Sequence, residues 1–125
     1  MARYYIDTCL WIDFIEGRTD DDVFTNIIED EDIIVYSYPL EKELLKYLNL
    51  SQLRMLYTLL SSKGLLYSVN VTDIEKFEAH ELSNSRNLPF ADTLHAVLAR
   101  DNDAVLLTRD KHFLILKDIC DVKLF

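Results

Sequence analysis

The sequence predicts an α/β fold in which a parallel sheet is covered on both faces by helices. Two observations support this prediction. The segments that look like strands are short, continuous runs of apolar residues, as in strands that are buried on both faces. Between these runs, apolar residues recur at helical spacing, as expected when crossover helices join parallel strands.

The first strand and the two helices after it follow from local patterns. The run from Arg3 to Ile6 predicts a buried strand, and a helix follows from Thr8 to about Glu16, which Gly17 ends as a left-handed residue. Thr19 and the acids at 20–22 can cap a second helix and suit the positive end of its dipole. The apolar positions of that helix are Val23, Phe24, Ile27 and Ile28.

The middle of the chain predicts two strands with two helices between them. Residues 33–36 form the first strand, and Pro39 suits the first turn of the helix that follows. The apolar stripe of that helix consists of Leu40, Leu44, Leu45 and Leu48. Ser51 is the expected N-cap of the next helix, which Gly64 ends before a strand at residues 65–69.

The last third of the chain predicts two helices and two strands. Residues 72–85 form a helix that begins with the capping-box pattern Thr72-x-x-Glu75. We expect its inner face to carry Ile74, Phe77 and Leu82. Pro89 opens the next helix, and apolar strands follow at residues 104–107 and 122–125.

The composition fits one domain that spans residues 1–125. Hydrophobic residues make up 50% of the chain, and no Gly/Ser/Pro-rich linker or internal repeat marks a boundary. No segment approaches the roughly 20 apolar residues that span a bilayer, and no signal-peptide pattern is present. Cys9 and Cys120 are too few for a disulfide framework and lack zinc-site spacing, so we expect reduced thiols in a soluble, cytoplasmic protein.

The net charge of -9 argues against a protein that holds nucleic acid by bulk electrostatics. It does not exclude a nuclease, because an acidic site can bind cations that bridge to phosphate. Local bases such as Arg109 and Lys111 would then complete the contact. The same charge favours a basic protein partner.

Four acids lie at the ends of predicted elements. Asp7 directly follows the first strand, and Asp110 lies just beyond the strand that ends at Leu107. Glu43 and Asp92 fall in the opening turns of predicted helices, where the helix dipole stabilises a carboxylate. Because functional groups gather beyond the carboxyl ends of parallel strands, we expect these acids to form one cluster.

Such a cluster predicts a bound divalent ion, since carboxylates repel one another and are costly to remove from water. Oxygen ligands favour Mg²⁺ or Mn²⁺, which keep several waters and lower the pKa of a bound water. This chemistry cuts phosphodiester bonds.

Four short motifs occur in order along nearly the whole chain. They are Tyr5-Ile6-Asp7-Thr8, Ser37-x-x-Leu40-x-x-Glu43-Leu44, Leu88-Pro89-x-x-Asp92-Thr93-Leu94-His95-Ala96 and Leu107-Thr108-Arg109-Asp110-x-x-Phe113. In this order they resemble the motifs of the PIN-domain ribonucleases, and within that family the small VapC-like toxins of type II toxin–antitoxin pairs. The last two motifs are the specific ones, because acid, apolar helix, apolar strand and Thr-x-Asp occur together.

The resemblance implies a three-layer α/β/α fold with a central, mainly parallel five-stranded sheet. The implied catalytic and metal-binding acids are Asp7, Glu43, Asp92 and Asp110. Further candidates for positioning an acid, a water or the substrate are Thr8, Thr108, Arg109, Lys111 and His112. The resemblance also implies RNA as substrate, homodimers, and inhibition by an antitoxin protein.

Two positions depart from a simple match to the family. Glu41 competes with Glu43 for the second acid, and we prefer Glu43 because the spacing from Ser37 in the family selects it. His112 stands where many relatives carry another acid. This substitution favours one tightly bound ion with a second that the substrate recruits.

The sequence therefore leads to the hypothesis of a Mg²⁺- or Mn²⁺-dependent endoribonuclease that hydrolyses RNA through a metal-activated water, as the toxin of a toxin–antitoxin pair. Two alternatives remain within the family: an RNA-processing nuclease outside such a pair, and a catalytically silent binding module. A phosphatase of the haloacid-dehalogenase type would need a second Asp where Cys9 stands, and a response-regulator receiver would need an acid pair that is not clear here.

Overall fold

A computed structural model describes residues 1–18 and 23–125 of the chain. Within these residues, five strands form one sheet in the order β3-β2-β1-β4-β5, and every neighbouring pair is parallel. The strands are β1 (Arg3–Ile6), β2 (Ile33–Ser37), β3 (Leu66–Val69), β4 (Val105–Thr108) and β5 (Val122–Leu124). The predicted parallel sheet is confirmed, and each strand lies within two residues of its expected bounds.

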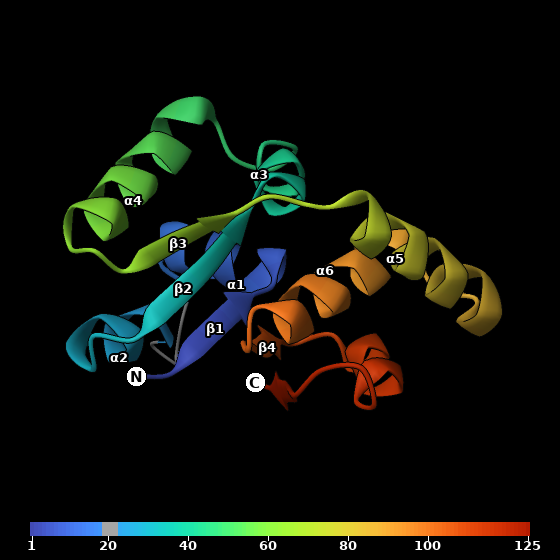
Figure 1. Cartoon of the computed structure of the whole chain (residues 1–125). Coiled ribbons are helices and arrows are strands. Elements are labelled where there is room, and N and C mark those ends of the chain that lie inside the picture. The colour runs from blue at the N-terminus through green and yellow to red at the C-terminus, as the bar shows by residue number, and fades with distance from the viewer. Residues whose placement is uncertain (19–22) are drawn as a thin grey trace.

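Helices lie on both faces of this sheet, so the expected three-layer arrangement is also confirmed. In Figure 1, α6 crosses the near face of the sheet and α1 lies behind it. The helices are α1 (Thr8–Ile15), α2 (Val23–Glu29), α3 (Tyr38–Leu44), α4 (Leu50–Ser62), α5 (Asp73–Arg86), α6 (Phe90–Asp101) and the 3₁₀ helix η1 (Lys111–Leu116). None of the described helices is long and apolar enough to cross a membrane.

Several helix ends form as the local sequence predicts. The Thr72 side chain accepts a hydrogen bond from the Glu75 backbone N–H, and Glu75 reaches back to the Thr72 backbone, so the capping box is present. Gly17 and Gly64 follow α1 and α4 with φ angles of 69° and 70°, which other residues rarely adopt. The proposed cap at Thr19 and the acids beside it lie outside the described residues.

The start of α4 differs from the prediction, because Asn49 and not Ser51 is the N-cap. The Asn49 side chain accepts a hydrogen bond from Gln52 N at 2.8 Å, and the Gln52 side chain accepts one from Asn49 N at 3.1 Å. This reciprocal capping box satisfies two backbone donors, whereas a cap at Ser51 would lack a Glu or Gln three residues later.

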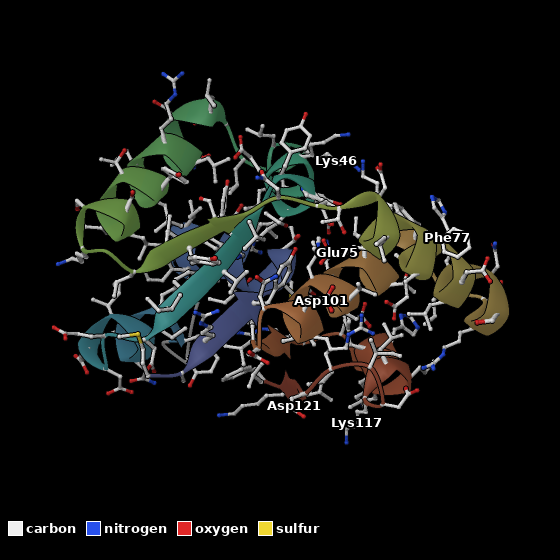
Figure 2. The ribbon with its side chains drawn as sticks, in the orientation of Figure 1. Lys46, Glu75, Phe77, Asp101, Lys117 and Asp121 are labelled. Carbon is white, nitrogen blue, oxygen red and sulfur yellow. The ribbon has the colours of Figure 1, made fainter. Side chains whose placement is uncertain are left out.

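The inner face of α5 also differs from the prediction. Ile74 and Phe77 are 79% and 67% exposed, and Phe77 stands on the outer side of the helix (Figure 2). The buried positions of α5 are Glu75 and Ala79, and Leu82 packs partly against the core as expected. Because α5 packs mainly against α6, a small residue such as Ala79 lets the two helices approach closely.

The helix α3 begins earlier and ends earlier than predicted. Ser37 caps it by accepting a hydrogen bond from Leu40 N at 3.3 Å, and the helix stops at Leu44. Consequently Leu45 is 41% exposed and does not join the apolar stripe. Glu43 lies near the carboxyl end of α3, not in its opening turn, so the predicted stabilisation by the helix dipole is wrong for this residue.

The order of the strands creates a switch point between β1 and β4. The chain moves from β1 outward to β2 and β3, and then returns to place β4 on the other side of β1. In open parallel sheets, crossover helices on either side of such a point diverge, which leaves a crevice beyond the carboxyl ends of the two strands. The residues that directly follow β1 and β4 therefore face one crevice.

Candidate active site

A cavity of about 390 Å³ lies at this switch point. Four separate segments contribute to it: the start of α1, the end of α3, the first turn of α6 and the loop after β4. Its lining consists of Asp7, Thr8, Cys9, Ile12, Glu43, Tyr47, Asp92, Arg109, Asp110 and Phe113. The structure thus brings together all four acids that the sequence singled out, and we call this the acid cavity.

Asp7 is held by hydrogen bonds to both of its carboxylate oxygens. Oδ1 accepts from Thr8 N at 2.8 Å, which makes Asp7 the N-cap of α1. Oδ2 accepts from the Thr108 hydroxyl at 2.7 Å, and the Cys9 thiol donates to it at 3.5 Å. Burial and the nearby Asp7 charge raise the pKa of the Cys9 thiol to about 11, so this residue is a thiol and not a thiolate.

Thr108 links the two acids that follow β1 and β4. Its side chain is fully buried, and its oxygen accepts a hydrogen bond from Asp110 N at 2.9 Å while its proton goes to Asp7. Asp110 in turn accepts from His112 N at 2.9 Å, and its Oδ1 lies 3.1 Å from His112 Nδ1. One buried hydroxyl therefore sets the relative placement of two loops.

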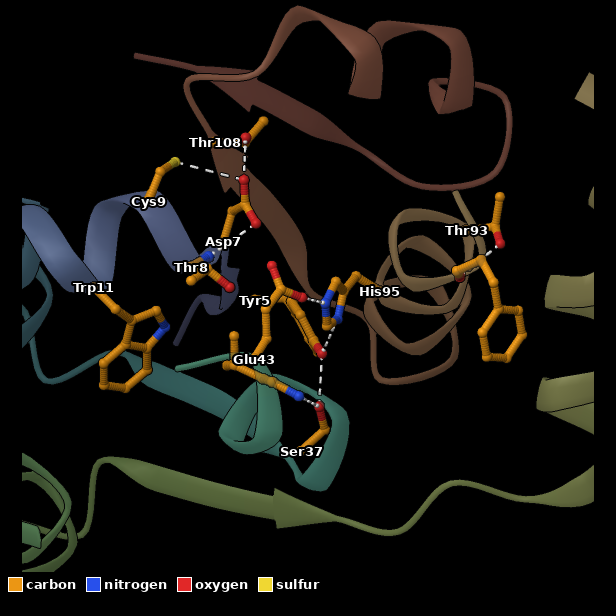
Figure 3. A network of polar contacts seen from close by, with 12 residues as sticks. Tyr5, Asp7, Thr8, Cys9, Trp11, Ser37, Glu43, Thr93, His95 and Thr108 are labelled. Atoms are coloured by element: carbon orange, nitrogen blue, oxygen red, sulfur yellow. Dashed lines mark hydrogen bonds and ion pairs between the residues drawn. The ribbon is translucent and has the colours of Figure 1, made fainter. Parts of the chain in front are cut away.

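Glu43 ends a chain of polar contacts that runs into the core (Figure 3). Glu43 Oε2 lies 3.0 Å from His95 Nε2, and His95 Nδ1 lies 2.6 Å from the Tyr5 hydroxyl. The Tyr5 oxygen lies 2.6 Å from Ser37 Oγ. The hydrogen bond from His95 holds the pKa of Glu43 below its usual range, although burial opposes this.

His95 is not among the candidate site residues that the sequence singles out. One local signal was available, since His95 follows Asp92 by three residues and therefore shares its face of α6. The contact partners themselves come from other elements.

The charges of the other acids affect the pKa of Asp92. It lies in the first turn of α6 and is half-buried. Burial raises its pKa to about 6, with Asp7 as the next cause, while Asp110 and Glu43 add to the shift and His95 opposes it. The four carboxylates are thus close enough to repel one another.

The remaining candidate residues occupy different places around the acid cavity. Arg109 lines the cavity and forms an ion pair with Asp13, in which Arg109 Nε lies 3.0 Å from Asp13 Oδ2. Lys111 and His112 are exposed residues of η1 outside the described lining. Glu41 accepts a hydrogen bond from Tyr36 at 3.1 Å and is not among the cavity residues, so Glu43 is the acid that α3 contributes.

The residues of the acid cavity fit a hard divalent cation. The donors are carboxylate oxygens whose mutual repulsion a cation would offset, and the buried Thr8 hydroxyl lies close enough to Glu43 to help lower the pKa of that acid. In the part of the chain that is described, no three acidic, His or Cys side chains already stand at ligand spacing. Mg²⁺ retains several waters and needs only one or two direct carboxylates, so this spacing is compatible with it.

Comparisons with solved structures find proteins of similar fold. The structure of VapBC2 from Rickettsia felis bound to a DNA fragment from their promoter matches with a TM-score of 0.72 at 19% identity, covering 97% of this chain and 97% of that chain. VapBC-1 from nontypeable Haemophilus influenzae matches with a TM-score of 0.65 at 16% identity, covering 98% of this chain and 97% of that chain. PAE2754 from Pyrobaculum aerophilum matches with a TM-score of 0.61 at 13% identity, covering 97% of this chain and 89% of that chain.

At such low sequence identity, these structural matches show a shared fold. A comparison with curated protein sequences gives no significant match. A family model described as PIN domain matches residues 4–118, which include all four acids of the cavity. The chain therefore belongs to the PIN domain family.

Proposed function

We propose that this protein is a Mg²⁺- or Mn²⁺-dependent endoribonuclease of the cytoplasm. The observation that carries the proposal is the convergence of Asp7, Glu43, Asp92 and Asp110 on one cavity at the switch point of the sheet. PIN-domain ribonucleases, which the four motifs resemble, carry acids at these positions. Two cysteines without the pattern of a disulfide framework favour a reducing compartment.

The acids of the cavity and the polar residues that hold or flank them have proposed tasks in RNA hydrolysis. A bound ion would polarise a phosphoryl oxygen and lower the pKa of a water. The four acids would hold the ion, and Thr108 keeps Asp7 and Asp110 at a fixed separation. Arg109 lines the same cavity and would draw a phosphate toward it, while the exposed Lys111 adds positive charge nearby. No covalent intermediate is required.

The number of resident ions is proposed to be one. His112 pairs with Asp110 and occupies the position where many relatives carry a further acid. A second ion would therefore arrive with the phosphate of the substrate. Calorimetric titration with Mn²⁺ should give a stoichiometry near one without RNA, and a value near two would contradict this.

Cleavage of total RNA tests the proposed activity. We expect fragments in Mg²⁺ or Mn²⁺ and none after chelation. Asp7→Asn and Asp92→Asn should abolish cleavage while circular dichroism stays unchanged, because each substitution removes a charge of the ion site. Asp121→Asn, at an exposed acid outside the cavity lining, is the matched control and should cleave normally. Full activity of both cavity variants would refute the assignment, and absence of Mn²⁺ binding would favour a silent binding module.

We further propose that the protein is the toxin of a toxin–antitoxin pair and binds a basic antitoxin. Two of the similar structures are VapBC complexes, and the net charge of -9 favours a basic partner. An apolar cavity of about 470 Å³ between α1 and α4 offers a contact surface. Its lining consists of Phe14, Ile15, Gln52, Met55, Leu56 and Leu59.

Co-purification with the product of the adjacent gene tests this partnership. Met55 is 75% exposed, so Met55→Asp should weaken binding of that product without loss of fold. Charge reversal in the acidic segment from Glu29 to Asp32 should also weaken it if a basic stretch binds there. A neighbouring gene that encodes no DNA-binding protein, together with an RNA-cleaving enzyme, would favour the RNA-processing alternative.

A homodimer is the proposed assembly. Ile74 and Phe77 form an exposed apolar patch on α5, which is a surface that a second copy can bury. Light scattering should give twice the mass of the chain for the wild type and the mass of one chain for Phe77→Lys. Equal masses for both proteins would remove α5 as the interface.

A further inference from the structure

We propose that His95, fixed by Tyr5 and Ser37, is a positioning residue that holds the carboxylate of Glu43 in the acid cavity. The inference rests on the proposed function, since it assigns a role within the same site. It concerns the buried hydrogen bonds that reach Glu43 from the protein core, which are not made by the four acids themselves.

The contacts form an uninterrupted chain from the core to the cavity. Ser37 and Tyr5 are 1% and 0% exposed, and the side chain of His95 is 2% exposed. The Glu43 side chain, at the other end, is 28% exposed. The three contacts measure 2.6, 2.6 and 3.0 Å, all within hydrogen-bond range. A rigid, buried chain therefore ends on a carboxylate that opens to the cavity.

The hydrogen-bond donors and acceptors are fully matched for only one arrangement of protons. Ser37 Oγ accepts from Leu40 N–H, and among the described residues the Tyr5 oxygen is the one acceptor in reach of the Ser37 proton, so the Ser37 hydroxyl donates to Tyr5. The Tyr5 O–H then donates to His95 Nδ1, which leaves Nε2–H to donate to Glu43. A proton on Nδ1 instead of Nε2 would place the bare Nε2 lone pair against the Glu43 carboxylate.

Glu43 needs such a partner because its own helix holds it poorly. The helix α3 has 7 residues, and Glu43 is next to its last residue, where helices fray. Glu is also a long side chain that loses considerable rotamer freedom when it is ordered. His95, in contrast, lies within α6 and is clamped by Tyr5, whose ring centre is 5.3 Å away. The helix α6 thus supplies Asp92 and also orients Glu43.

Nitrogen NMR of histidine-labelled protein tests the proton arrangement directly. We expect a proton on Nε2 of His95, with Nδ1 as the acceptor of a hydrogen bond. In Tyr5→Phe the Nδ1 signal should shift while the proton stays on Nε2, because only the donor to Nδ1 is gone. This measurement does not depend on any nuclease activity. A proton on Nδ1 of the wild type would overturn the inference.

Mn²⁺ affinity, measured by calorimetry on the full chain, tests the positioning role. Removal of a group that orients a metal ligand typically weakens metal affinity about 10- to 100-fold, and we expect a loss of this size for His95→Leu. His95→Gln should recover most of the affinity, because an amide N–H can still donate to Glu43. Tyr5→Phe should lose about fivefold, the worth of one neutral hydrogen bond.

A matched control separates positioning from a general loss of stability. Thr93 is another buried polar residue of α6, and its hydroxyl donates to the carbonyl of Ala79 at 2.8 Å on the side of the helix away from His95 (Figure 3). Thr93→Val should lower the melting temperature but leave Mn²⁺ affinity unchanged. An equal loss of affinity in Thr93→Val and His95→Leu, or no rescue by His95→Gln, would overturn the inference.

The outcomes distinguish this inference from the proposed function. Normal Mn²⁺ affinity in His95→Leu, with its loss in Glu43→Gln, would refute the role of His95 and leave the ion site intact. A wild-type protein that binds no Mn²⁺ and cuts no RNA would refute the proposed function. The NMR tautomer would then decide alone whether His95 is held as inferred.

Discussion

Replacement of Thr108 by valine removes a hydroxyl that two acids of the cavity share, while the shape of the side chain stays the same. Thr108 is fully buried, donates to Asp7 at 2.7 Å and accepts from Asp110 N at 2.9 Å. A hydrogen bond to a charged group contributes about 1.5 to 3 kcal/mol, and an unpaired backbone N–H costs about 1 kcal/mol when water can partly reach it. The added methyl group offsets about 0.8 kcal/mol.

The expected net loss is about 2 kcal/mol of the free energy of unfolding. At about 4 °C per kcal/mol for a chain of this size, the melting temperature should fall by about 8 °C. Urea denaturation without metal measures the loss, and the fluorescence of Trp11 reports it because this single tryptophan is 1% exposed. RNA cleavage should fall about 10- to 100-fold, since Asp7 loses its orienting partner.

Two further variants of buried threonines decide whether this reasoning is correct. Thr93→Val removes a hydroxyl that donates to neutral carbonyl groups, so it should cost about 1 kcal/mol and leave cleavage unchanged. Thr108→Ser keeps the hydroxyl and should restore most of the cleavage. If Thr108→Val is no less stable than Thr93→Val and cleaves RNA like the wild type, Thr108 does not link the two acids in the way the distances indicate.

Three other predictions concern the turn after α4, the rim of the acid cavity and its charge. Gly64→Ala should cost about 1 kcal/mol in urea denaturation, because φ is +70° and nothing lies within 4 Å of an added Cβ, so backbone strain acts alone. Tyr47→Ala should raise the KM of RNA cleavage about tenfold, since its exposed ring lines the cavity and can stack on an unpaired base; Tyr67→Ala, outside the cavity lining, should not. Asp92→Asn should stabilise the metal-free protein by about 1 to 2 kcal/mol at pH 7, as measured by urea denaturation. Because the folded pKa of Asp92 is about 6, above its unfolded value, this gain should fade as the pH falls from 6 toward 4, and a gain that persists at pH 4 would contradict it.

Local patterns were sufficient to predict the sheet and most helix ends. The apolar runs, the capping box at Thr72 and the left-handed glycines are short-range signals, and the structure confirms them. The cap of α4 was mispredicted because Asn49 and Ser51 are both good capping residues, and only the partner Gln52 distinguishes them. The inner face of α5 was mispredicted because α6, and not the sheet, is its main contact.

The candidate site was likewise predictable only in part from the sequence. Strand ends were enough to predict that Asp7 and Asp110 would meet, because carboxyl ends of parallel strands share one edge. Glu43 followed instead from its spacing to Ser37 in the family motif, since its expected place in the opening turn of a helix was wrong. The groups that hold those acids were not predictable from spacing. His95 and Glu43 are 52 positions apart, and His95 and Tyr5 are 90 apart. No periodic pattern relates residues at such separations.

These long separations tie the ion site to the completed fold. Asp7 and Glu43 come from the first half of the chain, and each is held by a residue of the last third: Thr108, which is 101 positions from Asp7, and His95. Contacts of this range form only after β4 has joined β1 and α6 has covered the sheet, since loop closure must precede them. A partly folded chain therefore lacks oriented carboxylates, and the capacity to bind the ion appears only when both sides of the switch point are in place.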